Sequence, residues 1–301
     1  MKKLLLICCL ATPFCTTPSF ADNTPLQLAM LEQDVQSTRS PATDSWQSLN
    51  PRNLKLSSAA ALVLDDNGNE VYAKDADQAL PIASITKLVT AMVILDADLP
   101  LQEKILITRD DRDLIQLTGS RLTSGATLSR KQLLQLALMS SENRAANALA
   151  RSWPQGKNDF VRAMNDKATA LDMHTSRFTD PAGLDAGNVA TPHDIAKMVR
   201  AAMQYPLIRK ATTTRSISVY PWKGRGPLRY SNTNRLLKNT AWEIQLSKTG
   251  YLNEAGRCLV MQAEIAGQPL VIVLLNSFGK LTPFGDSNRL RKWLQTELTQ
   301  G

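Results

Sequence analysis

The order of its secondary-structure patterns constrains this 301-residue chain most strongly, because strand-like segments lie at both ends and a helical block lies between them. Residues 59–64 and 70–73 flank the turn-forming residues 65–69, which predicts a β-hairpin. A closing helix is expected over residues 290–298. Further strands are predicted at residues 215–220, 227–231, 243–249, 257–265 and 269–276. We therefore predict an α+β fold in which the two terminal regions complete one antiparallel sheet, flanked by helices and an all-helical subdomain.

Helical spacing fills the middle of the chain. Apolar residues three to four apart predict a helix that begins near Ser84. Ser129 and Gln132 form a capping-box pair at the start of a second, largely apolar helix, which residues 140–143 interrupt. Two more helices are predicted over residues 160–171 and 191–203.

The N-terminus has the features of an export signal. Lys2 and Lys3 precede a short apolar run, and a small-x-small sequence ends at Ala21. We predict a signal peptide over residues 1–21, a loosely ordered leader over 22–56 and a catalytic domain over 57–301. Three of the four cysteines lie in the signal, so Cys258 would remain alone, and its apolar neighbours predict a buried thiol.

Three short motifs carry the chemical information. They are S-x-x-K at Ser84 and Lys87, S-x-N at Ser141 and Asn143, and K-T-G at residues 248–250. Each alone is weak, since residues 277–280 also match S-x-x-K and residues 48–50 also match S-x-N. Only the first set follows the order helix start, helix break and strand end. The alternative for Ser84 is a helix cap, with Lys87 on a solvated face.

The spacing of the first motif suits nucleophilic catalysis. A serine hydroxyl needs a base to take its proton, and a residue three positions later lies on the same helical face. Lys87 can act as that base only when it is neutral. Burial and a second cation, which Lys248 can supply, both lower the pKa of a lysine.

The other two motifs suit substrate binding and proton transfer. Ser141 can bridge the two ammonium groups and pass a proton to the leaving nitrogen, and Asn143 can hold the base and the substrate amide. Thr249, together with the lysine before it, suits a carboxylate beside the scissile bond. Gly250 allows a substrate backbone to approach the strand edge. The backbone N–H of Tyr251 can form an oxyanion hole with that of the nucleophile.

The sequence around these motifs resembles the low-molecular-weight penicillin-binding proteins of the D-alanyl-D-alanine carboxypeptidase family, and within them the endopeptidase branch. The resemblance extends from about residue 57 to 295 and includes residues 81–92, 139–146, 177–184, 232–234 and 245–251. It implies a serine β-lactamase-like fold and an acyl-enzyme serine peptidase that acts on peptidoglycan. Ser84 would be the nucleophile, Lys87 the proton acceptor, Ser141 the second catalytic serine and Lys248 a substrate binder.

The resemblance favours an endopeptidase that hydrolyses D-alanyl-diaminopimelate cross-links. Its partners would be peptidoglycan stem peptides and cross-links, with β-lactams as covalent inhibitors. Glu142 and the stretch 139–146 favour this branch, but the three motifs serve a carboxypeptidase equally well. A DD-carboxypeptidase and a non-catalytic peptidoglycan-binding protein therefore stay open as alternatives.

Other classes of function fit less well. A class A β-lactamase needs a water-activating glutamate, and no E-x-x-L-N segment lies between Ser141 and Lys248. A Ser-His-Asp hydrolase of the nucleophile-elbow type needs G-x-S-x-G, which is absent. A net charge of +8 without basic runs interleaved with aromatics does not predict nucleic-acid binding.

Metal and membrane attachment are not expected either. Two histidines and four cysteines leave little material for a zinc site, and we expect no metal or cofactor. The residues after Gly250 are taken up by two strands and a helix. We therefore expect a soluble periplasmic protein without a stable membrane anchor.

Overall fold

A five-stranded antiparallel sheet forms the centre of the protein, in the order β2-β1-β11-β10-β9. The computed structural model describes residue 46 and residues 49–300. The strands of the sheet are β1 (Ser58–Asp65), β2 (Glu70–Lys74), β9 (Glu243–Leu252), β10 (Gly256–Ile265) and β11 (Gln268–Ser277). The α+β fold expected from the sequence is confirmed.

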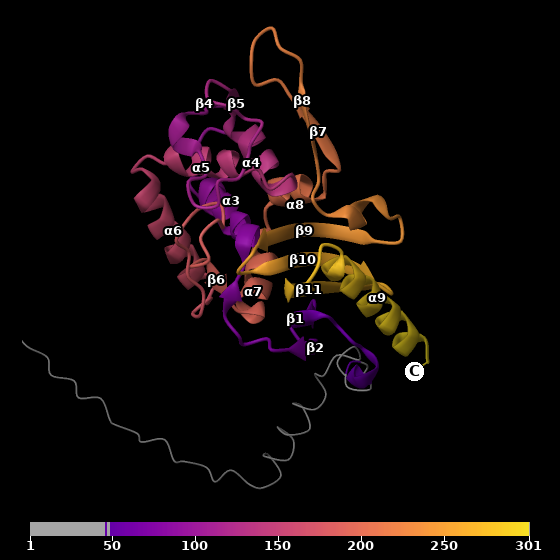
Figure 1. Ribbon diagram of the computed structural model, residues 1–301. Coiled ribbons are helices and arrows are strands. Elements are labelled where there is room, and N and C mark those ends of the chain that lie inside the picture. Colours follow the sequence, from indigo (N-terminus) through magenta and orange to yellow (C-terminus); the bar gives the residue numbers. More distant parts are fainter. Residues whose placement is uncertain (1–45, 47–48, 301) are drawn as a thin grey trace, which may run out of the picture. The chain divides into compact units, whose positions relative to one another are not determined.

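The two terminal regions pair with each other as predicted. β1 forms the expected hairpin with β2, and its other edge pairs antiparallel with β11, so that Ser58 lies opposite Ser277. The two predicted strands at 215–220 and 227–231 are found as β7 (Ser216–Val219) and β8 (Leu228–Ser231), but they form a separate hairpin outside this sheet. Figure 1 shows this hairpin extending away from the main sheet.

Both faces of the sheet are packed. Along β11, Val271, Val273 and Leu275 belong to the core shared with the helical block, whereas the alternate residues Ile272 and Leu274 face α9 (Thr282–Gln300). Successive side chains of a strand point to opposite faces, so a strand covered on both sides is apolar at nearly every position. This explains the almost continuous apolar runs at the C-terminal end of the chain.

The helical block lies beside the sheet (Figure 1). Its helices are α3 (Lys87–Asp96), α4 (Arg130–Met139), α5 (Asn143–Arg151), α6 (Lys157–Ala170), α7 (Pro192–Ala202) and α8 (Pro206–Thr213). The predicted capping box is present, because Ser129 Oγ accepts from the backbone N–H of Gln132 and the Gln132 side chain accepts in return. Helix α8 was not predicted; it begins at Pro206, and residues 203–205 separate it from α7.

Two further short sheets and four 3₁₀ helices complete the described part of the chain. Strand β3 (Leu80–Pro81) pairs with β6 (Val189–Ala190), and β4 (Lys104–Leu106) pairs with β5 (Thr127–Ser129). The 3₁₀ helices are η1 (Pro51–Asn53), η2 (Ala83–Thr86), η3 (Arg109–Asp111) and η4 (Arg235–Lys238).

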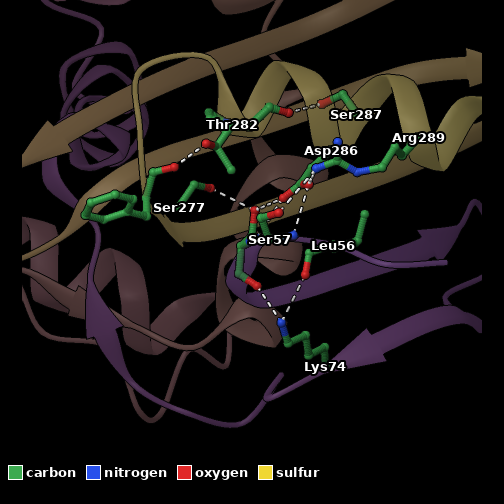
Figure 2. Close-up of polar contacts among 11 residues, drawn as sticks. Leu56, Ser57, Lys74, Ser277, Thr282, Asp286, Ser287 and Arg289 are labelled. Carbon is green, nitrogen blue, oxygen red and sulfur yellow. Dashed lines mark hydrogen bonds and ion pairs between the residues drawn. The ribbon is translucent and has the colours of Figure 1, made fainter.

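A buried carboxylate fixes the start of α9 against the sheet. Asp286 is fully buried and accepts hydrogen bonds from the backbone N–H groups of Ser57 and Ser58, at 3.0 and 2.7 Å, and from the Ser58 hydroxyl at 2.6 Å (Figure 2). It also pairs with Arg289 one turn later. The helix was expected only from residue 290. Its first two turns have few apolar residues, and this polar contact with β1 holds them in place.

The packed part of the chain begins before residue 57, although the sequence analysis extended the loosely ordered leader to residue 56. Trp46, Leu49, Leu54 and Leu56 are buried in the core under α9. The Trp46 indole also donates a hydrogen bond to Asp65 at 2.9 Å. Sparse apolar residues gave no periodic signal here, yet they pack into one core with residues of the sheet and of α9. The predicted signal peptide and most of the leader lie outside the described residues.

No helix among residues 46 and 49–300 is long and apolar enough to cross a membrane.

Candidate active site

The candidate nucleophile lies in a tight turn of 3₁₀ helix between two other segments. Ser84 belongs to η2, which leads directly into α3. On one side β9 passes at Gly250, where an added Cβ would lie 3.2 Å from Ser84 N and 2.9 Å from Ile82 O. On the other side lies Gly183, where a Cβ would overlap the Ala83 carbonyl at 1.9 Å. Both glycines are thus needed because η2 lies so close to them. The sequence analysis had expected Gly250 to allow the close approach of a substrate backbone.

Lys87 is fully buried and its ammonium group points at the candidate nucleophile. Its Nζ lies 2.7 Å from Ser84 Oγ, 2.8 Å from Asn143 Oδ1 and 2.5 Å from the carbonyl oxygen of Ala182. The amide and carbonyl oxygens can only accept hydrogen bonds. When Lys87 is neutral, its two N–H groups satisfy these two oxygens and its lone pair is directed at the Ser84 hydroxyl. The alternative of a helix cap with a solvated lysine is therefore wrong for this pair.

The electrostatic environment favours the neutral form of Lys87. Burial lowers the pKa of Lys87 to about 7, although the carboxylates of Asp180, Glu142 and Asp113 partly oppose this shift. The expected second cation is Lys248, also fully buried; burial and the charge of Lys87 lower its pKa well below the ordinary value. The charge interaction between the two amines thus lowers the pKa of Lys248, whereas the lowered pKa of Lys87 is due to burial.

Ser141 lies at the break between α4 and α5, as predicted. Its backbone adopts a φ of +59°, an unusual conformation for a residue with a side chain. Its hydroxyl accepts a hydrogen bond of 2.9 Å from Lys248 Nζ, which also donates to the Thr249 carbonyl at 2.9 Å. Ser141 was expected to bridge the two lysines, and the structure shows its hydrogen bond to Lys248.

The orientation of Asn143 is set by residues that no motif identified. Its Nδ2 donates to Thr118 Oγ1 at 2.9 Å, while its Oδ1 accepts from Lys87. The Thr118 hydroxyl donates its own proton to Asp113 at 2.6 Å, so it can only accept from Asn143. Asp113 also accepts from the backbone N–H groups of Ile115, Gln116 and Thr118. This loop lies in the region 97–128, where the sequence showed no sustained period.

The third motif lies on an edge strand. β9 is the last strand of the sheet, so a substrate backbone can pair with its outer edge. Thr249 Oγ1 is 2.7 Å from Thr233 Oγ1, which brings the stretch 232–234 next to the K-T-G motif. The half-exposed ring of Tyr251 packs under the guanidinium of Arg257 at 4.0 Å.

These elements enclose one cleft of about 580 Å³. Six of the eight predicted site residues line it, and the buried amines of the other two, Lys87 and Lys248, contact the lining residues Ser84 and Ser141. Its lining comprises Ser84, Ser141, Asn143, Asn232, Thr233, Arg235, Lys238, Thr249, Gly250, Tyr251, Arg257, Cys258, Lys280, Leu281, Pro283 and Phe284.

The serine of the duplicate S-x-x-K match and the remaining cysteine have structural roles. Ser277, the serine of the second S-x-x-K match, is buried and bonds to Ser58 at 2.7 Å (Figure 2). In the duplicate S-x-N match, Asn50 caps η1 by accepting from the backbone N–H of Arg52, whereas residue 48 lies outside the described residues. Cys258 is buried as expected, and burial raises its thiol pKa to about 11. A thiolate nucleophile is therefore disfavoured.

Sequence and structure comparisons relate the chain to known proteins. Residues 47–279 match the family described as D-alanyl-D-alanine carboxypeptidase. A D-alanyl-D-alanine endopeptidase of Pseudomonas aeruginosa is 47% identical over 247 residues, which cover 82% of this chain and 80% of that protein. One of Escherichia coli K12 is 44% identical over 243 residues, covering 80% and 78%. The crystal structure of the Streptomyces K15 DD-transpeptidase superimposes with a TM-score of 0.73 at 26% identity, covering 79% of this chain and 97% of that one.

Proposed function

The chain belongs to the D-alanyl-D-alanine carboxypeptidase family of peptidases, and we propose that within this family it is an acyl-enzyme serine endopeptidase. Its substrates are the D-alanyl-diaminopimelate cross-links of peptidoglycan. One observation carries the proposal: the fully buried amine of Lys87, with a pKa lowered to about 7, lies 2.7 Å from Ser84 Oγ in a cleft that holds the other two motifs.

We assign the first half-reaction to Ser84 and Lys87. Ser84 Oγ attacks the carbonyl carbon of the D-alanyl residue while its proton moves to Lys87 Nζ. The negative charge on the carbonyl oxygen is stabilised by the backbone N–H groups of Ser84 and Tyr251. Attack beside an edge strand is favourable because the substrate backbone can pair with β9 as it reacts.

The leaving strand departs when the carbon–nitrogen bond breaks. Ser141, hydrogen-bonded to Lys248, is placed to pass a proton to the leaving nitrogen. Thr249 and Lys248 bind the carboxylate beside the scissile amide. Water then hydrolyses the ester on Ser84, which releases the acyl strand as a carboxylate and restores the hydroxyl.

Covalent labelling tests the assignment of the nucleophile. Fluorescent penicillin should label the parent protein, and Ser84→Ala should abolish the label while the protein stays folded. Lys87→Arg keeps the charge but cannot deprotonate near neutral pH, so acylation should fall by orders of magnitude. Label that persists in Ser84→Ala, or acylation by Lys87→Arg within a few-fold of the parent, would contradict these roles.

A direct comparison of substrates tests the endopeptidase activity. Both similar proteins named above are endopeptidases, whereas the motif geometry serves a carboxypeptidase equally. A purified cross-linked muropeptide dimer and a monomeric pentapeptide are digested side by side and analysed by mass spectrometry. We expect faster release of monomers from the dimer than of D-Ala from the pentapeptide; the reverse order would make the protein a carboxypeptidase with the same acyl-serine chemistry.

We further propose that the protein is exported through its N-terminal signal and acts in the periplasm, where cutting cross-links would contribute to wall remodelling and cell shape. The apolar run after Lys2 and Lys3 supports export. Fractionation of cells tests this proposal. Recovery only in detergent-extracted membranes after signal cleavage would contradict it.

A further inference from the structure

The active-site cleft carries positive charge that the three motifs do not use. Four of its lining residues are Arg235, Lys238, Arg257 and Lys280, and none of its lining residues is acidic. We call these four residues the cationic arm. Within the described part of the chain, the structure gives none of them an ion pair; only Arg257 has a partner of another kind, the Tyr251 ring. Their charge therefore faces the cleft uncompensated by a protein carboxylate.

The cationic arm lines the same cleft as the residues assigned to the leaving-group carboxylate. Thr249, which binds the carboxylate beside the scissile bond, is hydrogen-bonded to Thr233. Two residues after Thr233 the chain enters η4, which begins with Arg235 and ends with Lys238. Arg235 and Lys238 therefore share the cleft with the site of the leaving-group carboxylate.

The two possible leaving groups differ in charge. Free D-Ala, the leaving group of a carboxypeptidase, has a single carboxylate, which the K-T-G motif already binds. The leaving strand of a cross-link is a peptide whose acidic residues add further carboxylates. Complementary charge in a cleft favours the partner that can use it.

We infer that the cationic arm is a binding subsite for the further carboxylates of the cross-linked leaving strand. The inference rests on the proposed endopeptidase function and adds to it a reason for preferring cross-links over free stem peptides. Arg235, Lys238 and Lys280 are exposed and Arg257 is half-buried, so each contact contributes little by itself. Several contacts in one cleft can still select between leaving groups.

A double-mutant cycle between protein and substrate tests the inference. Two cross-linked dimers are prepared that differ only in the leaving strand, where carboxamides replace the carboxylates other than the one beside the scissile amide. The parent protein is compared with Arg235→Gln/Lys238→Gln, since both side chains are exposed and the structure gives neither a hydrogen bond. Fluorescent penicillin counts the active molecules, so that rates are compared per active site.

We expect the parent to cleave the free-acid dimer with a kcat/KM roughly 3- to 10-fold above that for the carboxamide dimer at low ionic strength. In Arg235→Gln/Lys238→Gln this preference should shrink toward one, and added salt should reduce it in the parent. The control Lys104→Gln/Lys131→Gln removes the same charge from exposed positions outside the cleft lining and should keep the full preference.

An equal loss on both dimers in the Arg235→Gln/Lys238→Gln protein would overturn the subsite, and so would an unchanged preference. The pair Lys238→Gln/Lys280→Gln repeats the test if the first variant does not fold. A parent protein that binds penicillin but cleaves neither dimer would overturn the endopeptidase function itself, together with the subsite that depends on it.

Discussion

At the scale of single residues, the catalytic proposal depends on the hydrogen-bond partners of Lys87. Its three contacts are one hydroxyl and two oxygens that cannot donate, so only the hydroxyl can exchange a proton with it. Burial makes the charged form costly, and the nearby carboxylates keep the pKa at about 7 instead of lower. The residue is thus poised to act as a base close to neutral pH.

The pH dependence of acylation follows from this pKa. The base is the neutral form of Lys87, and its pKa in the folded protein is lowered to about 7. The penicillin acylation rate should therefore rise about tenfold per pH unit below pH 7 and level off above it. Stopped-flow acylation between pH 5 and 9 measures this profile; a rate independent of pH would contradict it.

Glu142→Gln shifts the same profile in a defined direction. The Glu142 carboxylate raises the Lys87 pKa, so its removal should lower that pKa and move the rising limb to lower pH by less than about one unit. Asp98→Asn, an exposed acid just beyond the end of α3, is the control and should leave the midpoint unchanged. A shift of the midpoint to higher pH would show that the sign is wrong.

Thr118 is predicted to be a positioning residue for Asn143. Thr118→Val removes the acceptor that holds Asn143 Nδ2, so the amide can rotate and present its N–H₂ group to Lys87. We expect acylation to slow by roughly tenfold, with little change in stability because Thr118 is exposed. Thr118→Ser keeps the hydroxyl and should restore the rate. Equal defects in the two variants would indicate a merely structural role.

At the scale of elements, the catalytic residues lie at two junctions between helices and on one edge strand. Ser84 lies where a 3₁₀ helix passes into α3, Ser141 lies between α4 and α5, and Lys248 lies on an edge strand. Ala83 and Ser141, at the two junctions, both have positive φ values. Such strained conformations persist only where surrounding contacts hold them, so the site depends on helices and sheet that are themselves firmly fixed.

Asp286 is the residue that fixes α9 to the sheet. Asp286→Asn would place an N–H₂ group against backbone N–H groups that now donate to the carboxylate, leaving at least one buried donor unsatisfied. We expect a loss of about 2–3 kcal/mol in the free energy of unfolding. Urea denaturation measures it. Glu297→Gln, a partly exposed change on the same helix, is the control, and similar losses in the two variants would contradict the role given to Asp286.

At the scale of the whole molecule, the sheet separates two packed cores. One core joins the sheet to the helical block that supplies Ser84, Lys87 and Ser141, and the other joins it to α9 and the segment before β1. Because β9 contacts η2 and Lys248 is hydrogen-bonded to Ser141, the K-T-G motif meets the other two motifs at this edge of the sheet. One face of the sheet therefore packs against the helices that supply catalytic residues, whereas the other face contributes to stability through the core under α9.

Trp46→Ala tests this separation. The side chain is buried in the core under α9 and bonds to Asp65, so its truncation should cost roughly 3–5 kcal/mol in the free energy of unfolding. Penicillin acylation of the folded fraction should keep its rate, because the catalytic side chains contact the other core. Trp46→Phe, which loses only the hydrogen bond and some packing, should cost less. A parallel loss of acylation rate would show that the two faces are coupled.

The sequence by itself determined the features that local chemistry controls. The hairpin of β1 and β2, the Ser129 capping box and the helix break at Ser141 depend on neighbouring residues, and all three were predicted. The order of the three motifs along helix start, helix break and strand end was enough to select the candidate site. A motif carries this information because its residues act at short, fixed spacings.

Only the tertiary structure decided which other groups complete the site. The contacts of Lys87 with the Ala182 carbonyl and of Asn143 with Thr118 join residues far apart in sequence, in segments without a regular period. The same holds for Ser277, the serine of the second S-x-x-K match, which is buried beside Ser58 and is therefore structural. Burial, partner choice and the lowered pKa of Lys87 all depend on which distant segments pack together, and no local pattern encodes that.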